Sequence, residues 1–285
     1  MKIPRGLEPL IEDGIIDAVI RPLKSGKEAS VYVVACGAII RCAKVYKEAE
    51  KRGFHKLAEY QEGRRARGSR DQRAMGKRSK HGRKQQEEAW KNAEVDALYR
   101  LEAAGVRVPK PHGYFDGVLV MELVDDGNGA PAPRLNDVTP TPDEARAWHA
   151  FLMNQIVRML CAGLIHGDLS EFNVLLGPDG PVIIDLPQAI DASGNNNAFR
   201  MLARDVENIT AYCGRQAPEL RKTWFAHEIW ALFEAAELRP DSVLTGEFIF
   251  PEGAADVDGV LEQIEEARWE AEARQRGREQ AEEED

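Results

Sequence analysis

The sequence has little of what marks a membrane protein or a secreted protein. No apolar run approaches the ~20 residues that a membrane-spanning helix needs, and the first residues, Met1 to Gly6, hold no apolar signal-peptide core. Only four of the 285 residues are cysteine, and no two of them form a CxxC pair, which argues against a zinc or disulfide framework. We therefore expect a soluble, cytoplasmic protein with reduced thiols and no membrane partner. Its length suits one large domain or two lobes.

Acidic residues are almost missing from one segment of an otherwise acidic chain. Residues 64–84 contain ten Lys or Arg and a single acid, Asp71, so this stretch carries +9 while the whole chain carries −10. A basic run in an acidic protein is a candidate contact for a polyanion such as RNA or a ribosomal particle. Since the run also lacks apolar residues, a solvated flexible linker is the alternative. Ser69 and Ser79 lie inside it as candidate autophosphorylation sites.

Three side chains of metal-binding types surround one predicted hairpin. Asp168 and Asn173 precede the strand-like Val174 to Leu176, and a Gly-Pro-Asp-Gly turn leads into a second apolar run that ends on Asp185. Strands of equal length bring the chain back to its starting point, so Asp185 should lie beside Asn173. Two carboxylates and an amide oxygen suit Mg²⁺, or Mn²⁺, at a phosphoryl-transfer site. The alternative is a hairpin with surface acids.

The N-terminal part reads as strands followed by one helix. Strand patterns cover residues 18–20, 31–34 and 39–46, and further strands are expected at 112–115 and 118–123. Lys44 falls on the apolar face of the third strand. The helix predicted over 87–104 places Glu94 on its buried stripe. Because an unpaired buried charge costs several kcal/mol, Lys44 and Glu94 should pair, either as a structural ion pair or around a phosphate.

The C-terminal part reads mainly as helices. A polar stretch after residue 124 marks the expected lobe boundary, and Thr141 with Glu144 predicts a capping box for a helix that runs to about residue 162. Further helices are expected over 197–213, 218–238 and 257–276. The predicted organisation is an N-terminal lobe over 1–124 with a basic flexible insert at about 47–86, a catalytic lobe over 125–240, and an acidic, partly helical tail over 241–285.

Three motifs together resemble the RIO kinases. Residues 25–32, S-G-K-E-A-S-V-Y, are similar to the family's S-T-G-K-E-A-N-V-Y loop. Residues 166–173, H-G-D-L-S-E-F-N, resemble its H-x-D-L-S-E-F-N catalytic loop, and 184–189, I-D-L-P-Q-A, resemble its I-D-x-x-Q-A segment. The resemblance runs from about residue 15 to 235. Since no winged helix precedes the phosphate loop, the RIO1-like branch fits best, as a bacterial member.

The resemblance implies a bilobal, protein-kinase-like α+β fold, with a small antiparallel-sheet N-lobe holding one helix and a mainly helical C-lobe. It implies Asp168 as the catalytic residue, and Asn173 and Asp185 as metal ligands. Asp205 is expected to brace the catalytic loop. The implied ATP-binding residues are Ser25, Lys27, Lys44, Glu94 and the hinge Met121, Glu122 and Leu123.

The expected function is Mg-dependent serine/threonine kinase activity with autophosphorylation, using ATP and an unknown protein acceptor. Gly167 and Ser170 stand where ordinary protein kinases carry the arginine and lysine of the catalytic loop. One alternative is slow ATP hydrolysis that drives a conformational switch in ribosome assembly. Another is a small-molecule phosphotransferase of the aminoglycoside or choline kinase type, because those enzymes also carry H-G-D-x-x-x-x-N followed by I-D.

Overall fold

The computed structural model describes residues 3–26, 29–47 and 93–250. The chain divides into a compact unit over Met1–Gly246 and a second unit over Glu247–Asp285. Most of the basic insert, including residues 64–84, lies outside the described residues, as do Lys27 and the helix expected over 257–276. All elements named below belong to the first unit.

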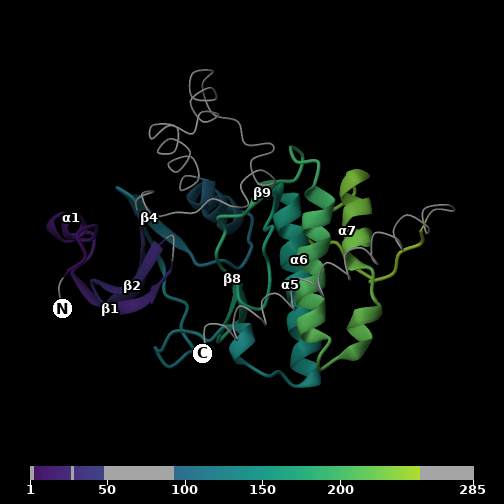
Figure 1. Cartoon of the computed structure of the whole chain (residues 1–285), viewed down its shortest axis with the longest axis horizontal. Helices are drawn as coiled ribbons and strands as arrows, with labels where there is room; N and C mark the ends of the chain where they lie inside the picture. Colours follow the sequence, from purple (N-terminus) through teal and green to yellow (C-terminus); the bar gives the residue numbers. More distant parts are fainter. Residues whose placement is uncertain (1–2, 27–28, 48–92, 251–285) are drawn as a thin grey trace, which may run out of the picture. The chain divides into compact units, whose positions relative to one another are not determined.

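The N-terminal half is built on a five-stranded antiparallel sheet in the order β1-β2-β3-β5-β4. Its strands are β1 (Ala18–Ser25), β2 (Ala29–Cys36), β3 (Ile39–Tyr46), β4 (Pro111–Phe115) and β5 (Val118–Glu122). All five runs predicted as strands are strands. The segment between residues 46 and 111 returns the chain to the far edge of the sheet, so β3 pairs with β5 rather than with β4. Figure 1 shows this sheet beside the helical half of the molecule.

The two faces of the sheet pack against different partners, because side chains alternate along each strand. On the outer face, Ala43 and Val120 pack with Leu10 of the short helix α1 (Glu8–Glu12). The inner face joins the main core together with a helix that covers residues 93–103. On this helix Glu94 and Leu101 are both buried, as the sequence pattern predicts, although the apolar neighbours of Glu94 would not accept an unpaired charge.

The C-terminal half is mainly helical. Its helices are α5 (Pro142–Cys161), α6 (Ala198–Cys213) and α7 (Phe225–Glu234), with 3-10 turns η2 (Leu135–Asp137) and η3 (Pro218–Lys222). The predicted capping box is present: the Oγ1 of Thr141 accepts a hydrogen bond from the Glu144 N–H, and the Glu144 carboxylate accepts one from the Thr141 N–H. Two helices were therefore predicted to within one residue of their observed ends.

The single helix predicted over 218–238 is wrong. Residues 218–222 form the 3-10 turn, and Thr223 is extended, with φ −107° and ψ 153°. The next N–H, that of Trp224, donates to the carbonyl of Gly246 at 2.7 Å instead of closing a helical turn. A contact with a distant part of the chain thus interrupts a sequence whose apolar periodicity is helical.

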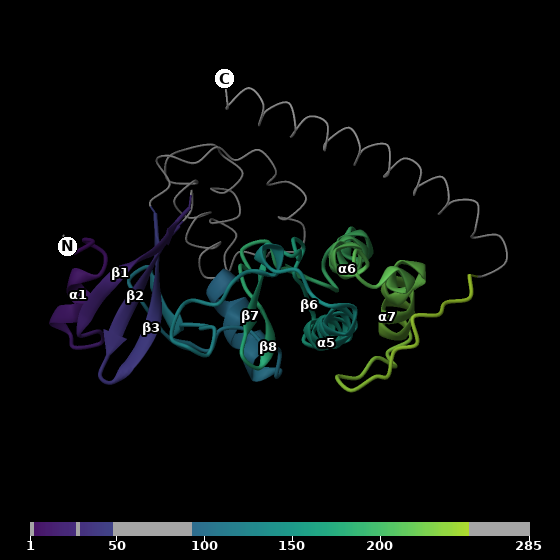
Figure 2. The same ribbon diagram turned by 90° about the horizontal axis from the view of Figure 1, so that it is seen from below.

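A small hairpin lies between the sheet and the helices. It consists of β7 (Val174–Gly177) and β8 (Gly180–Ile183), while the short strands β6 (Leu164–Ile165) and β9 (Ile190–Asp191) pair beside it. Figure 2 shows the order of these layers, from α1 through the sheet and the hairpin to the helices α5, α6 and α7. The predicted bilobal α+β architecture is confirmed. Among the described residues, no helix has both the length and the apolar character to cross a membrane.

Candidate active site

Lys44 is held on the inner face of the sheet by an acidic partner. Its Nζ forms an ion pair with Oε1 of Glu94, and Tyr46 donates a hydrogen bond from its hydroxyl to Oε2 of the same carboxylate at 2.8 Å. Both Lys44 and Glu94 are largely shielded from water, with side-chain exposures of 14% and 6%. Burial lowers the pKa of Lys44, but the carboxylates of Glu94 and Asp185 outweigh it and raise the pKa overall. The ammonium is therefore charged at neutral pH.

Asp185 connects the sheet with the hairpin. One of its carboxylate oxygens lies 3.5 Å from Lys44 Nζ, while half of its side chain, 51%, stays exposed. The residue has a positive φ of 68°, a conformation that costs a non-glycine residue about 1 kcal/mol or more. Just before it, the Ile184 N–H donates to the carbonyl of Asn173 at 3.0 Å. The predicted meeting of Asp185 with Asn173 at the hairpin base is thus present in the backbone.

Asp168 and Asn173 share one loop. The Asn173 amide donates from Nδ2 to the Asp168 carbonyl at 2.8 Å and approaches the Asp168 carboxylate at 3.4 Å. This orientation leaves the amide oxygen of Asn173 for another partner. Burial raises the pKa of Asp168, against the lowering effects of His166 and Arg204. A carboxyl group with a raised pKa is a stronger base when ionised, as a proton acceptor in catalysis requires.

Asp205 of α6 binds the main chain of this loop. Its carboxylate accepts hydrogen bonds from the N–H groups of Gly167 and Leu169, each at 2.8 Å. Gly167 has a φ of 78°, which suits a glycine. Two further residues of α6 bind the carbonyl groups of the same two loop residues. Asn208 donates to the Leu169 carbonyl at 2.9 Å, and Arg204 donates to the carbonyl of Gly167. The predicted brace is therefore directed at the backbone on both sides of Asp168.

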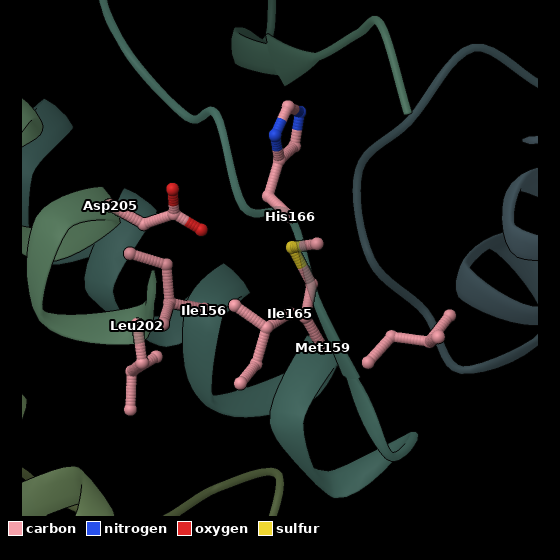
Figure 3. Close-up of a pocket in the computed structure, with 7 residues that line it drawn as sticks. Ile156, Met159, Ile165, His166, Leu202 and Asp205 are labelled. Carbon is pink, nitrogen blue, oxygen red and sulfur yellow. The ribbon is translucent and has the colours of Figure 1, made fainter. Parts of the chain in front are cut away.

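His166 and Asp205 also border a small internal cavity beneath the loop. Figure 3 shows both side chains with the apolar residues that surround them. The lining residues are Ile156, Met159, Leu164, Ile165, His166, Leu202 and Asp205. The Nδ1 of His166 accepts from the Asp168 N–H at 3.3 Å, so its Nε2 is the atom that donates to the Ile184 carbonyl at 3.0 Å. His166 thereby links the catalytic loop with the residue before Asp185.

The predicted phosphate loop is described only at its two ends. Ser25 Oγ lies 3.1 Å from Ser30 Oγ, and Lys47 donates from Nζ to Ser25 Oγ at 3.2 Å and to the Gly26 carbonyl at 2.6 Å. Lys47, which the sequence pattern assigned to the start of the insert, thus fastens this loop. Nothing in the sequence signals this contact, because Lys47 and Ser25 meet only through the pairing of β1, β2 and β3.

The predicted hinge leaves the sheet at the end of β5. Glu122 forms a two-pronged ion pair with Arg107, with N–O distances of 2.7 and 2.9 Å, and also accepts from the Lys110 N–H at 3.0 Å. These contacts lower the pKa of Glu122 although burial opposes them. The Glu122 carboxylate is thus occupied by Arg107 and the Lys110 N–H. Arg107 was not predicted, and no motif marks it.

The sequence matches the model of one protein family. The model of the RIO domain matches residues 30–225. The chain belongs to the RIO family. This region contains all but the first residue of β2, together with β3, the catalytic-loop residues and α6, so the fold that positions Lys44, Asp168 and Asp185 is the RIO fold.

Similar proteins support the same assignment. The chain is 36% identical over 215 residues to the RIO-type serine/threonine-protein kinase Rio1 of Haloferax volcanii, covering 74% of this chain and 68% of the relative. It is 32% identical over 195 residues to the Methanocaldococcus jannaschii Rio1 kinase, covering 68% and 62%. Human serine/threonine-protein kinase RIO1 is 28% identical over 216 residues, 73% of this chain but only 35% of that protein. The predicted enzyme class, an atypical serine/threonine protein kinase, is confirmed by family.

Membership in this family implies the use of ATP and a divalent metal, and the chemistry of the site residues fits both. The half-exposed Asp185 carboxylate and the available amide oxygen of Asn173 are hard oxygen donors of the kind that Mg²⁺ prefers. Lys44 is a buried cation suited to phosphate oxygens. The side chains present at the site are therefore suited to hold a metal ion and a nucleoside triphosphate.

Proposed function

We propose that this RIO protein transfers the γ-phosphoryl group of Mg-ATP to a serine or threonine hydroxyl of a protein acceptor, including its own. Asp168 is the catalytic residue, and Asn173 and Asp185 hold the metal. Lys44, positioned by Glu94, binds the phosphates.

One observation carries this proposal more than any other. Lys44 Nζ lies between two carboxylates, those of Glu94 and Asp185, which come from different halves of the fold. A purely structural ion pair would need only Glu94. The second carboxylate remains half exposed beside it, as expected where a metal-bound phosphate has to fit between cation and acid.

The residues of the chain perform positioning and proton transfer. Asp168 accepts the proton of the acceptor hydroxyl, and its raised pKa favours this step. Asp205 keeps Gly167 and Leu169 in place, so the Asp168 carboxylate does not need to reorganise during the reaction. A metal held by Asn173 and Asp185 would neutralise charge on the transferred phosphoryl group and on the ADP that leaves.

The nucleotide is held at its two ends. Ser25, at the end of β1, and Lys27, which follows it, cover the phosphates, while the main chain of residues 121–123 receives the adenine. In this proposal residues 1–124 form the N-lobe, residues 125–240 the catalytic lobe and residues 241–285 a tail. Magnesium is the expected metal, and Mn²⁺ would fit the same donors.

A second candidate is ATP hydrolysis that switches the conformation of a ribosomal particle. The charge of residues 64–84, ten Lys or Arg against one acid, favours a polyanionic partner for that role. The third candidate, a small-molecule phosphotransferase, is disfavoured because the relatives reported above are all named protein kinases.

The test is to incubate the purified chain with γ-labelled ATP and Mg²⁺, with and without a ribosomal fraction. Label on the protein itself or on an added protein supports the kinase. Free labelled phosphate alone, stimulated by the ribosomal fraction, supports the switch. A chain that binds no ATP and releases no label would contradict both, and a parallel reaction with Asp168→Ala controls for contaminating kinases.

A further inference from the structure

Two cations beside the candidate active site have no role in the function proposed above. Lys24 is the next-to-last residue of β1, and Arg134 directly precedes η2. Lys24 is exposed, and Arg134 is half-buried. Within residues 3–26, 29–47 and 93–250, neither side chain forms an ion pair with a carboxylate.

The register of the sheet directs Lys24 to the same face as Lys44. Lys24 lies opposite Val31, Val31 lies opposite Lys44, and Lys44 lies opposite Leu119. Residues directly opposite one another in antiparallel strands project to the same face. Since Val118 and Val120 pack with α1, this row projects to the other face, toward the main core and the site. Lys24 and Lys44 are two strands apart, about 10 Å at the backbone.

The main chain at Arg134 is paired with the hairpin of β7 and β8. It forms a β-bridge with Leu175 of β7, and the neighbouring Pro133 carbonyl accepts a hydrogen bond from Leu176 at 2.8 Å. It is thereby attached to the hairpin that leads from Asn173 to Asp185. One cation thus comes from the sheet and one from the hairpin side.

The two side chains lie within electrostatic reach of each other. Burial lowers the pKa of Lys24, repulsion by Arg134 lowers it further, and attraction by Asp185 opposes them. In the proposed function the charge of Asp185 is directed at a metal, which would leave the two cations without a neutralising acid. Two like charges in this situation favour an anion between them.

We propose that Lys24 and Arg134 form a second anion-binding pair of the cleft, separate from Lys44, which takes an oxyanion group of the reacting ligands. This proposal rests on the proposed function. Two sources share the required chemistry: the phosphate chain of the nucleotide, and an acidic side chain next to the acceptor hydroxyl.

The variants for the test change charge at matched positions. Lys24→Gln and Arg134→Gln remove one charge each, and the double variant removes both. Lys24→Arg keeps the charge. Lys222→Gln, at an exposed lysine of η3 in the helical half, is the control for lost net charge. Because neither Lys24 nor Arg134 makes a side-chain ion pair in the described residues, these variants should keep the melting temperature of the parent protein.

Two probes separate the two sources. Calorimetry measures the Kd of inorganic tripolyphosphate, and kinase assays measure the KM of two serine peptides, one flanked by Glu and one flanked by Gln. We expect each neutral variant to raise the Kd of tripolyphosphate, or the KM of the Glu peptide, about tenfold, as for a lost charge-assisted hydrogen bond. Lys24→Arg and Lys222→Gln should stay within about twofold of the parent. If both cations bind one anion, the double variant should lose less than the product of the single effects.

The outcomes are distinct. A change in tripolyphosphate binding assigns the pair to the nucleotide phosphates, and a change confined to the Glu peptide assigns it to the acceptor. No change in either, or an equal change in Lys222→Gln, overturns the proposal. The tripolyphosphate measurement needs no catalysis, so it tests the pair even if the parent protein transfers no label and the proposed function itself fails. In that case a raised Kd in the neutral variants would support the pair, and an unchanged Kd would overturn it.

Discussion

At the scale of single residues, Asp205 places a buried carboxylate against the catalytic loop. It is 2% exposed and is satisfied by two backbone N–H groups. The hydrogen bonds favour its ionised form, but burial opposes them and raises its pKa to about 6. The protein therefore stabilises the catalytic loop with a carboxylate that is costly to keep charged.

This cost predicts a pH dependence of stability. Because the pKa of Asp205 is higher in the folded state than its ordinary value near 4, the folded state binds more protons between these two values. The contribution of this group to stability is full below pH ~4 and is lost as the pH rises to ~6, by up to about 3 kcal/mol. Urea unfolding of the parent protein and of Asp205→Asn at several pH values measures it.

The difference between the two unfolding free energies should change across pH 4–6 and stay constant above pH 7. Asn cannot ionise but keeps the size and one acceptor oxygen of Asp. A difference that does not vary with pH in that window would show that the two N–H groups hold the pKa of Asp205 at its ordinary value.

Asp168 and Asp185 should respond differently to truncation. Asp168→Ala should lower the rate of phosphoryl transfer by about 10²–10⁴-fold with little loss of Mg-ATP affinity, because it removes a base but no metal ligand. Asp185→Ala should weaken Mg²⁺-dependent nucleotide binding itself. Labelled-ATP assays and calorimetry measure the two effects. An Asp185→Ala protein with unchanged Mg-ATP affinity would argue against its role as a ligand.

At the scale of elements, local sequence signals account for most of the helices and strands. The helix α5 begins where Thr141 and Glu144 cap it, and β3 alternates so that Ala43 and Lys44 face opposite sides of the sheet. The interrupted region around Thr223 shows the limit of such signals. Its apolar pattern suits a helix, but the hydrogen bond from the Trp224 N–H to the Gly246 carbonyl joins distant residues, so no local pattern predicts it.

The capping box at the start of α5 can be tested on its own. Thr141→Ala removes the hydroxyl that accepts from the Glu144 N–H at 3.3 Å, and it should lower the free energy of unfolding by about 1 kcal/mol. Thr141→Ser keeps the acceptor and should have a much smaller effect. Kinase activity should be unchanged in both, since α5 contributes no site residue. Chemical denaturation provides the measurement, and equal losses in the two variants would exclude the cap as the cause.

At the scale of the whole molecule, the charge is strongly divided. Residues 64–84 carry +9 in a chain of net charge −10. This stretch lies outside the described residues, and its role as a contact for RNA remains a prediction. The site itself needs none of it, because Lys44 and Glu94 lie on either side of the insert.

Deleting residues 64–84 should abolish RNA binding and leave ATP hydrolysis intact. In the parent protein, RNA affinity should fall by roughly 0.7–0.9 log units per phosphate contact for each tenfold rise in salt. Phosphorylation of Ser69 and Ser79 would add about −3 to −4 of charge and should also weaken RNA binding. Filter binding over a salt series measures these effects. RNA affinity that survives the deletion would identify this stretch as a solvated linker.

The sequence alone determined the local parts of this protein. Hairpin geometry placed Asp185 next to Asn173, strand alternation placed Lys44 on an apolar face, and helical periodicity buried Glu94, because each depends on neighbours within a few residues. The catalytic-loop motif pointed to the RIO family before any contact was visible.

How these parts meet depends on packing between distant segments of the chain. That packing brought Lys44 to 3.5 Å from Asp185, paired Arg107 with Glu122, and turned Lys24 toward the site. These contacts join residues far apart in the chain, and they depend on how the sheet and the hairpin pack against each other. Local propensities carry no information about that packing, since it is the shared burial of apolar surface that determines which distant segments become neighbours.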